Sequence, residues 1–88
     1  MTVSFRKSFL RDLKKVKDPK VRDRVRDVIE AVEKAEALAD VAGVKKMSGR
    51  SGYYRVRIGD FRVGLAVEGE EIEFVRVLGR KDIYKHFP

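Results

Sequence analysis

The chain contains no cysteine and a single histidine, His86. Without cysteine it can form neither disulfide bonds nor thiolate metal sites, and one imidazole cannot by itself hold a metal ion. We therefore expect no metal and no cofactor. The first residues, MTVSFRKSF, lack the long apolar run of a signal peptide, and no segment is apolar enough to span a membrane. These absences predict a protein without a membrane contact, located in the cytoplasm.

Familiar catalytic motifs are missing as well. The chain has no Ser-His-Asp or Cys-His combination beyond what His86 alone could offer, no glycine loop for phosphate and no HExxH motif. Most carboxylates fall on an expected helix surface or in Glu68–Glu73, where they are more typical of a solvated surface than of a catalytic acid pair. These absences leave the basic residues as the main candidates for function.

Positive charge is what the chain has in excess. Its 88 residues include 21 Lys and Arg against 14 Asp and Glu, which gives a net charge of +7 and a pI near 9.9. The length predicts one domain, residues 1–88, with a thin core. A basic surface favours acidic partners, namely nucleic acid, an acidic protein or anionic lipid. Composition alone does not choose among these three.

The first half of the chain has the pattern of two helices after a short strand. Thr2–Arg6 alternates apolar and polar residues and predicts an edge strand. Ser8 predicts the N-cap of a first helix, and Asp18 followed by Pro19 predicts a break and the start of a second. Gly43 predicts the end of the helical region. The apolar residues that would line the inner faces of both helices recur at three- and four-residue spacing: Phe9, Leu10, Leu13, Val16, Val21, Val25, Val28, Ile29 and Val32.

The second half predicts a meander of three antiparallel strands. The expected strands are Tyr53–Ile58, Phe61–Val67 and Glu71–Leu78, joined by short turns. Arg80–Pro88 predicts a short helix or turn. The expected fold class is therefore α+β. An N-terminal helical hairpin, with a short first strand, would pack on a twisted antiparallel sheet, and a short helix or turn would end the chain.

The segment Lys45–Arg62 has the most informative pattern. Six of its eighteen residues are Lys or Arg, and only Asp60 is acidic. The alternation of the first meander strand places Arg55 and Arg57 on one face and apolar residues on the other. Neighbouring arginines on one face repel each other, so a polyanion such as RNA would stabilise this arrangement.

Arg62 is expected beside Arg57 if a hairpin pairs the first two strands of the meander. Gly64 and Ala66 would then leave a shallow floor without bulky side chains on the same face. Guanidinium groups around such a floor could bind phosphate oxygens and neutralise charge in a transition state. Any one of these arginines is also typical of a solvated strand surface. The residues alone therefore predict a nucleic-acid binder and leave catalysis open.

Three stretches of the chain resemble the RelE/ParE superfamily of bacterial and archaeal toxins: Lys46–Gly49, Tyr54–Arg62 and Gly79–Tyr84. The similarity extends over nearly the whole chain and implies the RelE-like microbial RNase fold and a toxin of a type II toxin–antitoxin system. The implied activity is that of an mRNA interferase, a ribosome-dependent endoribonuclease. Such an enzyme cuts mRNA in the ribosomal A site by attack of a 2′-hydroxyl and so inhibits translation. The implied partners are the ribosome, A-site mRNA, an acidic RelB-like antitoxin, and operator DNA reached only through the antitoxin complex.

Carried over by position, the resemblance implies catalytic roles for five residues. Arg55 and Arg57 would grip the scissile phosphate, and Arg62 would stabilise the transition state. Arg80 would lie near the leaving group. Tyr84 would stack on or orient a nucleotide and help to activate the 2′-hydroxyl. RNA and ribosome contacts would come from five further basic residues, the first two expected in a loop: Lys45, Lys46, Arg50, Lys81 and Lys85.

The chain departs from the family pattern at Gly79, where many relatives have histidine. The site thereby loses its one imidazole. Because arginine stays protonated, Arg55 and Arg57 can stabilise charge but are poor proton carriers. The expected mechanism is therefore electrostatic and positional. Two alternatives remain open: a ParE-like toxin that inhibits DNA gyrase without cutting RNA, and an inactive module that binds an antitoxin and operator DNA.

Overall fold

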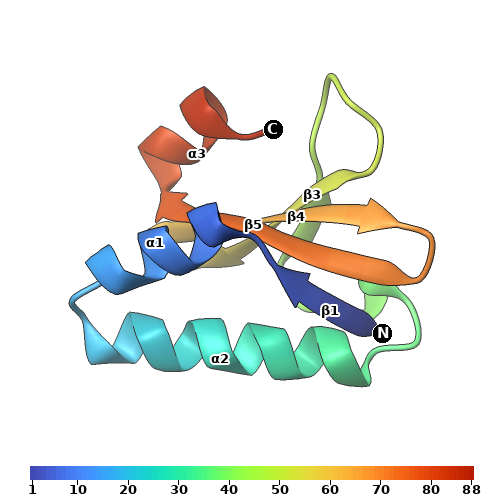
Figure 1. The fold of residues 1–88 in the computed structure, drawn as a ribbon, viewed down its shortest axis with the longest axis horizontal. Helices are drawn as coiled ribbons and strands as arrows, with labels where there is room; N and C mark the ends of the chain where they lie inside the picture. The colour runs from blue at the N-terminus through green and yellow to red at the C-terminus, as the bar shows by residue number, and fades with distance from the viewer.

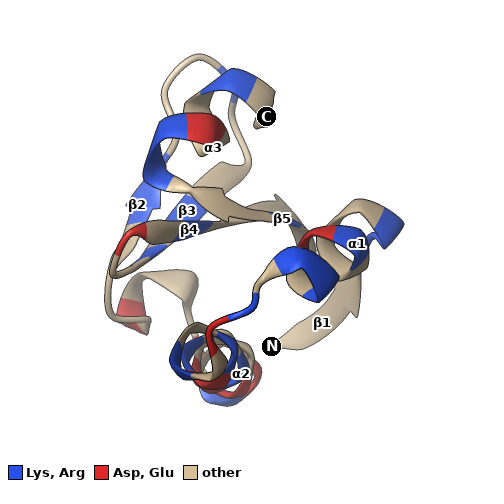
Figure 2. Cartoon of the chain, turned by 90° about the vertical axis from the view of Figure 1, so that its left-hand side faces the viewer, with Lys and Arg blue, Asp and Glu red and all other residues tan.

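A five-stranded sheet separates the helices of the molecule (Figure 1). The computed structural model describes all residues, Met1–Pro88. Helix α2 crosses one face of the sheet, α3 lies over the other, and α1 runs beside one edge, as the view along α2 in Figure 2 shows. The elements follow in the order β1 (Thr2–Phe5), α1 (Lys7–Lys15), α2 (Pro19–Lys34), a 3-10 turn (Leu38–Asp40), β2 (Val44–Lys46), β3 (Tyr53–Ile58), β4 (Phe61–Glu68), β5 (Glu71–Gly79) and α3 (Arg80–His86).

The sheet is mixed, with the strand order β1-β5-β4-β3-β2. Strands β2 to β5 are antiparallel to their neighbours, whereas β1 pairs in parallel with β5. The α+β class, the first edge strand and the meander are confirmed. The prediction of a wholly antiparallel sheet was wrong. The pattern of a strand shows which residues lie on each face but does not show the direction of the neighbouring strand.

Side chains of α1 bind the edge of β5 beyond the point where β1 ends. The Ser8 hydroxyl donates to the Val75 carbonyl at 2.6 Å, and the Val77 N–H donates to the Asp12 carboxylate at 3.1 Å. Asp12 is only 6% exposed and accepts two further hydrogen bonds from Arg76, at 2.7 and 3.1 Å. These bonds raise the pKa of the Arg76 guanidinium. The edge of β5 is thus satisfied first by a strand and then by helix side chains.

The predicted helix ends are confirmed only in part. Asp18 caps α2 by accepting a hydrogen bond from the Lys20 N–H at 2.9 Å. Ser8 as an N-cap was wrong, because α1 begins at Lys7 and the Ser8 hydroxyl is used by the sheet. Gly43 does not end a helix, since α2 stops well before it. Gly43 instead forms the turn before β2, with φ of +82°. No helix in the structure is both long and apolar enough to cross a membrane.

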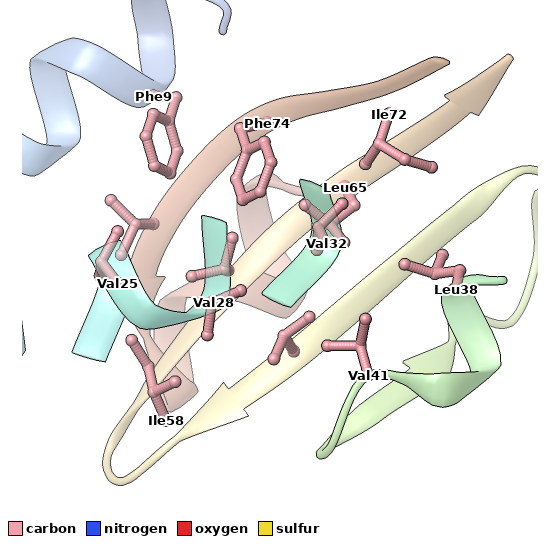
Figure 3. Close-up of a cluster of buried hydrophobic side chains, with 13 residues drawn as sticks. Phe9, Val25, Val28, Val32, Leu38, Val41, Ile58, Leu65, Ile72 and Phe74 are labelled. Atoms are coloured by element: carbon pink, nitrogen blue, oxygen red, sulfur yellow. The ribbon is translucent and has the colours of Figure 1, made fainter. Parts of the chain in front are cut away.

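The main core lies between α2 and the sheet (Figure 3). It confirms the predicted apolar stripe of α2. The alternation of β3 puts Val56 and Ile58 in this core and leaves Arg55 and Arg57 on the opposite face, as predicted. The core contains 13 buried residues: Phe9, Val25, Val28, Val32, Leu38, Val41, Val56, Ile58, Val63, Leu65, Ile72, Phe74 and Val77.

A smaller apolar cluster lies on the opposite face of the sheet, beneath α3. Phe87, at the end of α3, rests directly on Gly64 of β4. A Cβ atom built on Gly64 would fall 2.8 Å from the Phe87 ring. The predicted open floor around Gly64 was therefore wrong, because an aromatic ring fills it. The cluster consists of the buried residues Met47, Val75, Ile83 and Phe87, with Tyr53, Ala66 and Leu78 packed against them.

Candidate functional site

A hollow of about 460 Å³ opens between β2, β3 and the end of α3. It brings together four of the predicted site residues, Lys45, Lys46, Arg55 and Tyr84. Tyr84 is 61% exposed, so its ring is accessible to a ligand. The Nη1 atom of Arg55 donates to the Gly43 carbonyl at 2.9 Å, and its buried Nε has no acceptor. A guanidinium with unused donors beside an exposed phenol ring can hold the phosphate and the base of a nucleotide.

Lys45 and Lys46 lie in a strand rather than in the predicted loop. Strand β2 pairs with β3, and Lys45 is directly opposite Arg55. Because directly opposed residues share a face of the sheet, Lys45 adds a second positive charge beside Arg55. The pattern did not predict β2, since three residues are too few for a periodicity to be recognised.

The remaining predicted arginines gather at the β3–β4 hairpin. The register pairs Arg57 with Arg62, as predicted. Arg57 is exposed, whereas Arg62 is only 9% exposed, and its Nη1 donates to the Gly59 carbonyl at 2.7 Å and to a second hairpin carbonyl at 2.9 Å. Arg80 begins α3, and its backbone N–H donates to the Asp60 carbonyl at 2.8 Å. This hairpin group and the hollow are joined along β3, where two residues span about 7 Å.

The positive charges of the site are not neutralised within the molecule. Arg50 lies with its guanidinium 5.3 Å from the centre of the Tyr53 ring, and Lys81 and Lys85 are exposed on α3. Figure 2 shows Lys and Arg on β2, β3 and α3. The three ion pairs of the structure all lie elsewhere: Arg6–Glu73, Asp23–Arg26 and Asp12–Arg76.

Sequence reasoning missed several residues that shape the hollow. Met47, Ser48 and Pro88 line it together with Phe87. Phe87 also belongs to the apolar cluster that packs the end of α3 against the sheet. One feature of the sequence could have indicated a group packed on the sheet, because a glycine inside a strand often marks the close approach of another group. Gly64 is such a glycine, and the group is the Phe87 ring.

Comparison with known proteins places the chain among toxins of toxin–antitoxin systems. Residues 3–84 match the family described as the ParE toxin of the type II toxin-antitoxin system, parDE. The chain is 43% identical over 89 residues to Toxin RelE3 of Methanocaldococcus jannaschii, and the match covers all of both chains.

Solved structures agree with this placement. A chain of the RelB-RelE antitoxin-toxin complex from Methanococcus jannaschii superposes with a TM-score of 0.81 at 40% identity, covering 96% of this chain and 98% of that one. A chain of the archaeal RelE-RelB complex from Pyrococcus horikoshii OT3 gives a TM-score of 0.73 at 22% identity, covering 90% and 93%. The second likeness shows the fold alone.

Proposed function

The chain belongs to the RelE/ParE superfamily of type II toxin–antitoxin toxins, and on that premise we propose that it cuts mRNA as a ribosome-dependent endoribonuclease. It is a toxin of the RelE kind, as its full-length match to Toxin RelE3 shows. The observation that carries the proposal is that Arg55 lines a hollow with the exposed Tyr84 and that Arg55 and Arg57 lie on the same face of the sheet without an ion pair.

The reaction would begin with attack of a ribose 2′-hydroxyl on the neighbouring phosphorus. The P–O2′ bond forms as the P–O5′ bond breaks, which leaves a 2′,3′-cyclic phosphate on one fragment and a 5′-hydroxyl on the other. The 2′-hydroxyl loses one proton and the 5′ oxygen gains one, so no further reactant is consumed. Negative charge peaks on the phosphorus oxygens midway, where Arg55 and Arg57 would bind it.

Other side chains would hold the substrate around this phosphate. Tyr84 would stack on a nucleotide at the mouth of the hollow. Arg80 would stabilise charge on the departing 5′ oxygen, and Arg62 would add its positive charge from its buried place in the hairpin. RNA and ribosome contacts are proposed for five exposed basic residues around the site: Lys45, Lys46, Arg50, Lys81 and Lys85.

Dependence on the ribosome follows from what the site does not offer. His86 lines a separate hollow of about 360 Å³, together with Asp12, Arg76 and Asp82. Because no imidazole lines the hollow around Arg55, catalysis would depend on orientation and charge. A ribosome that holds mRNA in an attack geometry would supply the orientation that this small surface cannot impose alone.

An acidic antitoxin is the second proposed partner. The similar chain from Methanococcus jannaschii was solved as part of a RelB-RelE antitoxin-toxin complex. A net charge of +7 favours an acidic partner of the same kind for this chain. Operator DNA would then be reached only through the complex.

The decisive test is primer extension on mRNA from cells in which the chain is induced. We expect cuts in phase with codons for the wild type. Replacement of Arg55 or Arg80 with alanine should lower cleavage by about 10²-fold or more, the typical cost of removing one transition-state donor. Arg26→Ala on α2, whose guanidinium is exposed and pairs only with Asp23, should cut like the wild type. Growth arrest with intact mRNA would contradict the proposal.

The matching family is described as the ParE toxin, and this description favours a second candidate function, inhibition of DNA gyrase. The two functions separate cleanly in one comparison. A gyrase inhibitor would block supercoiling by the purified enzyme and leave mRNA whole. An inactive antitoxin-binding module would do neither and would leave growth unchanged on induction.

A further inference from the structure

The Phe87 ring lies against the bare backbone of Gly64, and we infer that this contact positions Tyr84 over the hollow. Phe87 is 3% exposed. Three atoms of its ring lie 2.8 to 2.9 Å from the point that a Cβ atom on Gly64 would occupy. A side chain at position 64 and the ring at position 87 therefore cannot coexist in this arrangement.

The contact fixes the end of α3 beside an arginine of the site. Gly64 is directly opposite Arg55 in the β3–β4 register, so the Phe87 ring rests next to Arg55 across the sheet. The Tyr53 ring meets the Phe87 ring edge-on, with 5.5 Å between ring centres. The Phe87 backbone N–H donates to the Ile83 carbonyl at 2.8 Å, which joins the ring to the last turn of α3.

Tyr84 lies between attachments of α3 to the sheet. The helix begins at the hydrogen bond from the Arg80 N–H to the Asp60 carbonyl, and it ends at Phe87 on Gly64. Ile83, the residue before Tyr84, is fully buried in the cluster beneath α3. Tyr84 itself is largely exposed and makes no side-chain hydrogen bond in the structure. Its place relative to Arg55 is therefore set by these attachments, of which Phe87 on Gly64 is the one at the end of the helix. Phe87 is a positioning residue, and Gly64 is the position that admits it.

A pair of substitutions tests the contact. Gly64→Ala adds a methyl group where the ring lies. Ala31→Ser, the control, adds a single atom at an exposed position of α2, on the opposite face of the sheet. In the ribosomal cleavage assay we expect Gly64→Ala to lower the rate by about 10²-fold, the cost of misplacing a group by about 1 Å, and Ala31→Ser to change it little. Equal effects of the two would overturn the inference.

A compensating change distinguishes displacement of the ring from general damage. Leucine at position 87 removes the ring and leaves room for a methyl group, so Gly64→Ala with Phe87→Leu should cut at nearly the rate of Phe87→Leu alone. Thermal unfolding of each variant identifies any that are not folded. If the double variant shows both losses in full, the two residues do not act through the contact.

A Tyr84→Ala background tests whether the contact acts through Tyr84. In that background Gly64→Ala should cause no further loss of cleavage rate, because the group that it misplaces is already gone. Losses that multiply would show that Gly64 acts on the reaction by another route.

The effect on rate rests on the proposed nuclease function, so a measurement without activity is paired with it. A proton over an aromatic ring resonates upfield, and the Gly64 Hα signals should return to ordinary values in Phe87→Leu. The Tyr84 ring signals should shift in Gly64→Ala but not in Ala31→Ser. If the wild type cuts no mRNA, the proposed function fails while these spectra still decide the contact. Gly64 Hα chemical shifts without an upfield displacement in the wild type would show that the Phe87 ring does not rest on Gly64.

Discussion

Arg57 and Arg62 face each other across the hairpin, yet their environments are opposite. Alternation along the strands predicted that the two would be neighbours on one face, and they are. It could not predict that Arg62 would turn back onto the hairpin carbonyls and become buried. The face of a side chain follows from backbone period, whereas its direction on that face depends on which acceptors lie near. Arg62 is therefore a structural residue as well as a candidate for catalysis.

Arg62→Ala should destabilise the protein, whereas Arg57→Ala, at the position directly opposite in the hairpin, should not. We expect Arg62→Ala to lower the free energy of unfolding by about 2 kcal/mol, because it removes two hydrogen bonds from a charged donor to part-buried hairpin carbonyls. Arg57→Ala, at an exposed position, should change it by less than about 0.5 kcal/mol. Urea denaturation measures both. Equal values would mean that the hydrogen bonds to the hairpin contribute nothing net.

Asp12 should be the most sensitive carboxylate in the chain. Its removal leaves the Val77 N–H without an acceptor and Arg76 without its partner. We expect Asp12→Ala to lower the free energy of unfolding by about 3 kcal/mol or more, as for a broken buried pair. Asp23→Ala is the control, since its ion pair with Arg26 is exposed and is worth no more than about 1 kcal/mol. A small effect at Asp12, measured by the same denaturation, would show that water replaces the carboxylate.

Helix α1 begins with an unfavourable charge. No acidic residue lies in its first turn, and Lys7 places a positive charge at the positive end of the helix dipole. We expect Lys7→Glu to raise the free energy of unfolding by about 0.3 to 1 kcal/mol. Lys14→Glu, in the last turn of the same helix, should lower it. Thermal unfolding at low ionic strength should show the two shifts with opposite signs, and shifts of the same sign would refute the dipole explanation.

The elements that the sequence predicted best are those with a long, regular pattern. Strands β3, β4 and β5 and the apolar stripe of α2 all repeat often enough for their period to be recognised. Strand β2 has only three residues, and the Ser8 hydroxyl, predicted to cap α1, binds instead to a strand more than sixty residues away. Such long-range contacts leave no local trace. The site was likewise predicted only in part. Alternation predicted the face that carries the arginines, but no sequence pattern predicted the hollow between β2, β3 and α3.

At the scale of the whole molecule, the net charge should control how fast an acidic antitoxin associates. The molecule measures 32 × 27 × 22 Å, so at about 0.01 M salt, where the screening length is about 30 Å, its whole field acts on a partner. At about 0.15 M the screening length falls to about 8 Å. We expect the association rate with the cognate antitoxin, followed by stopped flow, to fall at least about tenfold between these two conditions. A rate independent of salt would show that charge does not guide the encounter.

The parallel pairing of β1 with β5 also has a consequence for how the chain matures. The first strand has its only sheet partner in the last, and bonds such as Arg6–Glu73 join residues 67 positions apart. During synthesis β1 therefore cannot join the sheet until β5 has emerged from the ribosome. Pairings between residues so distant in the sequence also form slowly. Arg80 and Tyr84 emerge later still. We therefore expect a nascent or prematurely terminated chain to be harmless, because toxicity requires the complete polypeptide. The time needed for synthesis gives an antitoxin an interval in which to bind before the toxin is active.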